Sequence, residues 1–149
     1  MRIAFYAPLK PPDHPTPSGD RRVAQLFCTA LREAGHEPFL ASRLRSYDGA
    51  GDRLRQARLR RIGCRVAERL AHQWQREPGT APGAWFTYHL YYKAPDWLGP
   101  AVSTALGIPY LIAEASHAPK RAGGNWQIGH RAVEQALRRA DAVDRKSVV

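Results

Sequence analysis

The first residues that could do chemistry close a proline-rich loop near the N-terminus. Gly19, Arg21 and Arg22 follow the apolar segment RIAFYA and that loop, and they stand where a helix is predicted to begin. A glycine lets a ligand approach the backbone, and the free N–H groups of a helix N-terminus attract a phosphate or sugar hydroxyls. The alternative is a plain surface loop in which Ser18 or Asp20 caps the helix.

A second loop, YHLYYKAPDW, combines aromatic and basic residues. It contains His89, Tyr91, Tyr92 and Lys93. Aromatic faces beside a histidine and a lysine suit stacking on a carbohydrate or a nucleotide. The alternative is an aromatic core strand in which His89 is hydrogen-bonded in the interior.

A third loop, EASHAPKRAGG, contains Glu114, His117, Lys120 and Arg121. A carboxylate, an imidazole and two cations at the end of one strand suit an anionic substrate, although a single histidine also serves structure alone. No spacing typical of a Ser/His/Asp triad or of a metal site occurs, so the sequence predicts no metal. A dinucleotide fingerprint and a Walker loop are also missing.

Alternating apolar and amphipathic segments predict the elements that hold these loops. Strands are expected at 2–7, 37–44, 84–92 and 108–116, and helices at 21–34, 53–77, 95–107 and 127–143. This order predicts an α/β fold, a Rossmann-like open parallel sheet with helices on both faces, truncated before its last strands. Functional residues of such sheets gather at the carboxyl ends of the strands, which is where the three loops would lie.

Apolar spacing also predicts which helix faces are buried. The expected buried residues are Val23, Leu26, Phe27, Ala30 and Leu31 in the first helix, and Leu54, Leu59, Ile62, Val66, Leu70 and Trp74 in the second.

The net charge of +10 comes mainly from arginines, many of them within residues 53–76. A solvated helix face explains such a run, and an anionic membrane surface or an acidic partner is the alternative. Cys28 and Cys64 have no CxxC partner, so we expect free thiols in a reducing compartment, with Cys28 buried. No signal peptide or membrane span is evident, which predicts a cytoplasmic protein, or one at the inner membrane face.

Several segments together resemble a known family: MRIAFYAPLKPPDHPTPSGDRRVAQLF, HEPFLASRL, TYHLYYKAPDWLGPAVSTALGIPYLIAEASHAPKRAG and ALRRADAV. They resemble the N-terminal half of glycosyltransferases with the two-domain B fold, and more narrowly the retaining family 4. The resemblance implies that residues 1–143 form the acceptor-side domain of an enzyme that moves a sugar from a nucleotide-diphosphate sugar to an acceptor hydroxyl. It implies no metal and no cofactor besides that co-substrate.

The same resemblance assigns roles to individual residues. It implies that Gly19 lies near the donor phosphates, with Arg21 and Arg22 beside it, and that His117 is the catalytic candidate. The implied acceptor-cleft residues are His89, Lys93, Glu114, Lys120 and Arg121. The implied partners are a nucleotide sugar, a carbohydrate or lipid-linked acceptor and an anionic membrane at the periphery, with no specific nucleic acid.

The family's donor-binding domain has no counterpart in this sequence. The final residues, 144–149, read DRKSVV, which is also the translation of the start of a common sequencing-library adapter. We therefore expect a non-native tail, a natural polar tail being the alternative, and a fragment that is inactive alone. Two other functions stay open: a stand-alone basic Rossmann-like module that binds a nucleotide or an anionic surface without catalysis, and a different nucleotide-dependent enzyme on the same sheet.

Overall fold

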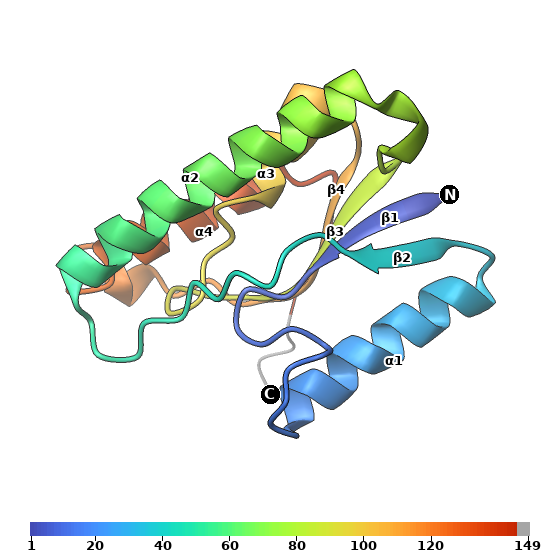
Figure 1. The fold of residues 1–149 in the computed structure, drawn as a ribbon. Helices are drawn as coiled ribbons and strands as arrows, with labels where there is room; N and C mark the ends of the chain where they lie inside the picture. The colour runs from blue at the N-terminus through green and yellow to red at the C-terminus, as the bar shows by residue number, and fades with distance from the viewer. Residues whose placement is uncertain (146–149) are drawn as a thin grey trace.

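Five parallel strands form the centre of the protein, in the order β2-β1-β3-β4-β5. A computed structural model describes residues 1–145 of the chain. The strands are β1 (Arg2–Tyr6), β2 (Glu37–Leu40), β3 (Ala84–Leu90), β4 (Tyr110–Ala115) and β5 (Ala142–Arg145). The prediction of an α/β fold with an open parallel sheet is therefore confirmed (Figure 1).

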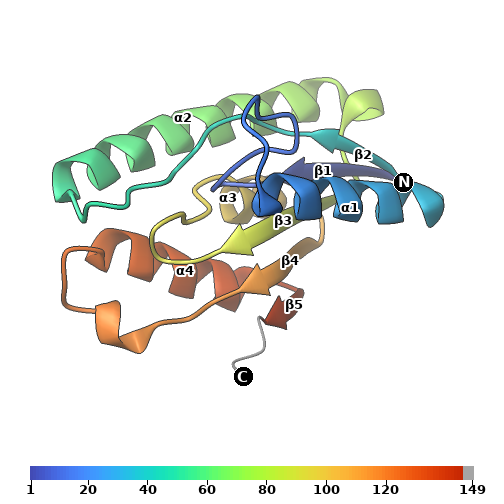
Figure 2. The same cartoon turned by 90° about the horizontal axis from the view of Figure 1, so that it is seen from below.

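Helices cover both faces of the sheet, as predicted. The helix α1 (Gly19–Glu33) lies on one face, and α2 (Arg53–Arg76), α3 (Gly99–Leu106) and α4 (Gln127–Arg139) lie on the other (Figures 1 and 2). Two short 3-10 helices, η1 (Pro78–Thr80) and η2 (Pro119–Arg121), belong to connections. Right-handed crossover connections explain which helices lie on which face of the sheet. The connection from β1 to β2 runs in one direction across the sheet, and the connections from β2 to β3, β3 to β4 and β4 to β5 run in the other.

The reversal of direction between β1 and β3 creates the switch point of the sheet. The connection that leaves β1 passes to the α1 face, whereas the one that leaves β3 passes to the opposite face. In open parallel sheets the two diverging loops leave a crevice at this place, where ligands bind. Figure 2 shows the loops that follow β1, β3 and β4 on one side of the sheet, at the carboxyl ends of its strands.

Each face of the sheet has its own core. The main core, on the side of α2, α3 and α4, contains Trp85, Leu98, Val102, Tyr110, Ile112 and Val133. The smaller core lies under α1 and contains Phe5, Ala7, Ala24, Cys28 and Tyr88. Cys28 is a buried free thiol, as predicted, and burial raises its pKa. Cys64 is free and exposed.

The buried faces of two helices agree with the prediction only in part. Val23, Phe27 and Leu31 of α1 pack against the smaller core. Val66, Leu70 and Trp74 of α2 pack in the main core. In α1, Ala24 is buried, while Leu26 is 57% exposed. In α2, Leu54 is 84% exposed, and the buried residues are Gln56, Gly63, Ala67, Ala71 and Trp74. The reason is close packing: a Cβ at Gly63 would collide with Trp97, so small residues rather than large aliphatic ones line the contact.

The C-terminal part of the described chain also corrects the prediction. The helix expected over 127–143 ends at Arg139, and residues 142–145 form a fifth strand at the sheet edge. Asp141 redirects the chain, because its N–H donates to the Tyr110 carbonyl (2.8 Å) and its carboxylate accepts from the Tyr110 N–H (2.9 Å). Of the predicted tail 144–149, Asp144 and Arg145 belong to β5, and the rest lies outside the described residues.

The other predicted bounds need smaller corrections. The second strand ends at Leu40 instead of continuing to residue 44, and α3 begins at Gly99. Gly107 terminates α3 in a left-handed conformation (φ 65°), as predicted. Ser18 is the N-cap of α1, and its hydroxyl accepts from the Arg21 N–H (3.1 Å). Within the described residues, no helix has both the length and the apolarity to span a bilayer.

A buried carboxylate joins β3, β4 and α3. Asp96 is 2% exposed, and its Oδ1 accepts from the N–H groups of Leu98 and Gly99, both at 2.8 Å. Its Oδ2 accepts from the hydroxyls of Thr87 and Tyr110, both at 2.6 Å. Burial raises the pKa of the Asp96 carboxyl, and the hydrogen bonds that it accepts partly oppose this shift.

Replacing this carboxylate by an amide should destabilise the fold. In Asp96→Asn one of the two accepting oxygens becomes an NH₂ donor, so either the two hydroxyls or the two backbone N–H groups lose their acceptor. We expect a loss of about 1–3 kcal/mol in the free energy of unfolding, measured by urea titration with circular dichroism. The matched control is Asp13→Asn, which breaks the exposed pair with Arg43 and should change stability by less than about 0.5 kcal/mol. Equal effects in the two variants would contradict this role of Asp96.

Asp96 should also make stability depend on pH. Its pKa is raised in the folded state, so the folded chain keeps this proton at pH values where the unfolded chain has released it. The resulting stabilisation is complete below the ordinary aspartate pKa of about 3.9 and is lost as the pH rises through the folded pKa. The free energy of unfolding should therefore fall across this window in the natural chain and fall less in Asp96→Asn. Identical pH profiles would rule out this linkage.

Candidate functional site

An imidazole–carboxylate pair lies at the switch point of the sheet. His89 Nδ1 lies 2.9 Å from Oδ1 of Asp20, which belongs to the first turn of α1. The side chains are 16% and 37% exposed, so the pair is shielded on one side and open to solvent on the other. In the tautomer that donates from Nδ1 to Asp20, His89 Nε2 carries a lone pair that can accept a proton or a hydrogen bond.

His89 reaches Asp20 because the backbone of β3 changes conformation at this residue. Thr87 and Leu90 both face the main core, although they are three residues apart, which strict alternation along a strand does not allow. His89 has φ 64°, a left-handed conformation that is uncommon outside glycine. It turns the imidazole away from the main core and toward α1.

Glu114 repeats this feature on the neighbouring strand. It has φ 58°, and Ile112 and Ala115 on either side of it both belong to the main core. His89 and Glu114 occupy matching positions, since the flanking residues pair as Tyr88 with Ala113 and Leu90 with Ala115. Two adjacent strained residues at the end of a sheet are a feature of functional sites, since only a well-packed surrounding structure maintains them.

Two tyrosines complete this group. Burial raises the pKa of Tyr88 above its ordinary value, and the carboxylates of Glu114 and Asp20 raise it further. Burial, together with Tyr47 and Asp20, raises the pKa of Tyr91 to about 12. The Tyr91 ring stacks on the His89 ring with a centroid distance of 5.1 Å. Both phenols are protonated at neutral pH, so they can donate hydrogen bonds but cannot serve as bases.

The predicted phosphate-binding residues stand at the start of α1. A Cβ on Gly19 would meet nothing within 4 Å, so the backbone there is open to a ligand. Arg21 instead holds the loop, because its Nη1 donates to the His14 carbonyl (2.9 Å). Arg22 is exposed. Asp20 places a carboxylate at the same helix end.

The predicted cations of the second and third loops meet over an aromatic pair. Arg121 lies 5.0 Å from the Tyr92 ring centre and 5.1 Å from that of Trp126. Lys93 lies 5.2 Å from the Trp126 ring centre. Lys120 is exposed and has no such contact within residues 1–145. The structure therefore brings Lys93 and Arg121 together, and the contact between the Tyr91 and Tyr92 rings joins this cluster to the His89–Tyr91 stack.

Buried polar residues position this cation–aromatic cluster. The Trp126 indole N–H donates to the Asp48 carbonyl (2.9 Å). The Gln56 amide donates to the Asp48 carboxylate (2.8 Å) and to the Asn125 carbonyl (2.9 Å). These bonds fix residues 125 and 126 to the start of α2 and to the loop before it.

His117 lies apart from the His89–Asp20 pair. It follows β4, is exposed, and stacks on His130 of α4 with a centroid distance of 5.4 Å. Since α1 and α4 cover opposite faces of the sheet, His117 is directed to one side and His89 to the other. The sequence places His117 and Glu114 in the same loop. In the structure the backbone at Glu114 is left-handed, so its side chain and that of His117, which stacks on His130, point in different directions.

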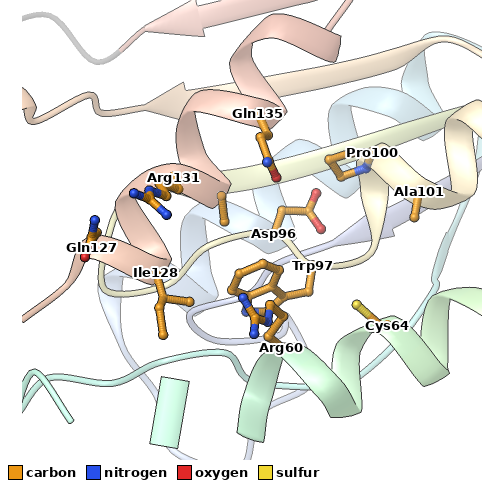
Figure 3. Close-up of a pocket in the computed structure, with 11 residues that line it drawn as sticks. Arg60, Cys64, Asp96, Trp97, Pro100, Ala101, Gln127, Ile128, Arg131 and Gln135 are labelled. Atoms are coloured by element: carbon orange, nitrogen blue, oxygen red, sulfur yellow. The ribbon is translucent and has the colours of Figure 1, made fainter. Parts of the chain in front are cut away.

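A cavity of about 490 Å³ lies elsewhere, between α2, α3 and α4 (Figure 3). Its polar lining consists mainly of Arg60, Arg131, Gln127 and Gln135, and Trp97 forms part of its apolar wall. None of the predicted site residues lines it. The strand-end group is the better functional candidate, because it combines the switch point, a shielded imidazole–carboxylate pair and backbone strain.

The sequence did not identify three residues of these groups as functional. The sequence predicts Asp20 only as a helix cap and Trp126 only as part of a loop, and it places Tyr88 in the second loop without a role of its own. The acid directly after Gly19 was an available signal for Asp20. For the others no local signal existed, because their partners are 26 or more residues away, as in the Tyr88–Glu114 and Trp126–Asp48 contacts.

Comparison with known proteins gives no match to a family model, to a curated protein or to a solved structure.

The strain at Glu114 can be measured directly by comparing glycine with alanine. In an ordinary strand glycine is less stable than alanine by roughly 0.5–1 kcal/mol, but a left-handed residue with a Cβ costs about 1–2 kcal/mol. We therefore expect Glu114→Gly to be more stable than Glu114→Ala by up to about 1.5 kcal/mol in urea unfolding.

The matched control is Glu37, an exposed residue of β2 that has no positive φ. There Glu37→Gly should be less stable than Glu37→Ala. The same order of stability at both positions would show that Glu114 is not strained.

Proposed function

We propose that this chain is the acceptor-side domain of a glycosyltransferase that uses a nucleotide-diphosphate sugar. The single observation that carries the proposal is the His89–Asp20 pair at the β1/β3 switch point, 2.9 Å between Nδ1 and Oδ1. The sequence resemblance to the two-domain B fold names the reaction class, and the pair supplies a group that suits an acceptor hydroxyl.

In this proposal His89 receives the acceptor. Asp20 accepts from Nδ1–H, which favours the tautomer with its lone pair on Nε2 and orients the ring. An acceptor hydroxyl would donate its hydrogen bond to Nε2, so that its oxygen gains electron density as it attacks the sugar. The proposal thus moves the catalytic role from His117 to His89, since His117 is directed toward α4.

The local charge favours a sugar over an anion as the ligand of this pair. Asp20 and Glu114 make the α1 side of the strand ends acidic, which would repel a phosphate and suit hydroxyl donors. The donor diphosphate is assigned to the open backbone at Gly19, where the exposed Arg22 would offset the charge of the neighbouring Asp20 carboxylate. Lys93, Lys120 and Arg121 remain cleft candidates on the neighbouring loops.

Saccharide binding by the purified chain tests the proposal. Ligand-observed NMR with a panel of glycosides should detect weak binding, and His89→Gln should weaken it roughly 2- to 10-fold, as expected for one lost hydrogen bond. The matched control is His72→Gln, an exposed histidine of α2. Equal binding by His89→Gln and His72→Gln, or no binding of any glycoside, would contradict the proposal. The chain alone should not turn over a nucleotide sugar.

A second function is supported by the surface of α2. Its arginines 53, 55, 58, 60, 61, 65, 69 and 76 are all exposed, and no salt bridge involving them occurs within residues 1–145. Such a surface would bind anionic lipid or another polyanion without catalysis.

Vesicle sedimentation separates the two functions. In the module alternative, Arg58→Glu/Arg65→Glu should abolish binding to vesicles containing phosphatidylserine and leave glycoside binding intact. In the enzyme proposal, His89→Gln should weaken glycoside binding and leave vesicle binding unchanged. If Arg58→Glu/Arg65→Glu removes glycoside binding and His89→Gln does not, the result would favour the binding module over the enzyme.

A further inference from the structure

We propose that His117, His130 and Glu134 form a binding site for a divalent transition-metal ion such as Zn²⁺. Each residue offers one ligand atom, and the three atoms lie within 4.8 Å of one another. The site uses none of the residues assigned to acceptor binding, so it stands independently of the proposed function.

Two of the three ligands share one face of α4. His130 and Glu134 are four residues apart, so they lie one helical turn from each other. The distance between His130 Nε2 and Glu134 Oε1 is 2.6 Å. The third ligand, His117, comes from the segment after β4, and its ring lies at 20° to the His130 ring with centroids 5.4 Å apart. Packing therefore holds the three side chains together before any ion binds.

The contact between His130 and Glu134 shows how an ion would enter. A hydrogen atom on Nε2 bridges this contact, and a cation with an open coordination position can take its place, releasing a proton to solvent. Zinc bonds of about 2.0–2.2 Å in a tetrahedron require ligand atoms roughly 3.3 Å apart. Nε2 and Oε1 would have to separate by less than about 1 Å, which the half-exposed Glu134 side chain permits.

The buried imidazole of His130 makes fewer hydrogen bonds than its two ring nitrogens allow. Its side chain is 3% exposed, and its Nδ1 has no hydrogen-bond partner within the described residues. Buried polar groups are normally paired, so an imidazole with a single partner calls for an explanation. An ion bound through Nε2 would replace the contact with Glu134 by a stronger bond to the buried ring, and Nδ1 would then carry the proton of the neutral imidazole.

The ligand types select the class of ion. Two imidazoles and one carboxylate match zinc and its neighbours, whereas Mg²⁺ and Ca²⁺ prefer oxygen ligands alone. Because His117 is exposed, a fourth position would be open to water. The ion would tie the segment after β4, which carries Lys120 and Arg121, to α4.

The first test is isothermal titration of tag-free protein with Zn²⁺ in a Cys64→Ser background, since Cys64 is an exposed thiol that could bind zinc by itself. We expect one ion per chain. Co²⁺ in place of Zn²⁺ should give visible absorption bands without thiolate charge transfer. No binding in this background would overturn the proposal.

Ligand variants provide the second test. His117→Ala removes an exposed ligand with little risk to folding, and Glu134→Gln keeps an acceptor for His130 while removing the charge. Each substitution should weaken Zn²⁺ binding at least about tenfold. Loss of a residue that only supports a metal ligand already weakens binding about 10- to 100-fold, and these residues are ligands themselves. The matched control, His72→Ala, should bind as the parent does. Affinities of both ligand variants equal to that of His72→Ala would overturn the proposal.

Discussion

The buried carboxylate of Asp96 is the interaction on which the candidate site depends. It accepts from Thr87 on β3, from Tyr110 on β4 and from the first N–H groups of α3, so one residue fixes how three elements meet. It thereby defines the path of residues 91–98, which carry the aromatic and basic side chains of the second loop. That path then passes so close to α4 that a Cβ at Gly129 would collide with the Tyr92 carbonyl.

This anchoring explains how the chain maintains two strained residues side by side. His89 and Glu114 lie where β3 and β4 end, and the residues beyond them, Leu90 and Ala115, are held in the main core. Because burial resumes directly after the left-handed residue, the backbone cannot relax by returning to regular alternation. The cost of strain is thus offset by apolar burial, and the result is a histidine directed at a carboxylate on another element.

The strand ends divide into two chemically different sides. Toward α1, Asp20 contacts His89, and Asp20 and Glu114 both lie close enough to Tyr88 to raise its pKa, an acidic setting that suits hydroxyl groups. Toward α4, His117 meets His130 and Glu134, while Lys93 and Arg121 lie over Tyr92 and Trp126. The proposed acceptor site and the proposed metal site therefore lie on opposite sides of the sheet, at the carboxyl ends of its strands. The left-handed backbone at His89 directs its side chain to α1, whereas His117, in the segment after β4, lies against α4.

By itself, the sequence determined the α/β class, the parallel sheet, the approximate elements and the three loops at the strand ends, because apolar periodicity and turn residues are local signals. It could not determine that residues 142–145 pair with β4, since their exposed, partly charged side chains have no strand pattern and Asp141 reaches Tyr110 only in space. It also could not show which site residues meet. The pairing of His89 with Asp20, and of His117 with His130, depends on backbone conformations and helix positions that side chains distant in the sequence impose together.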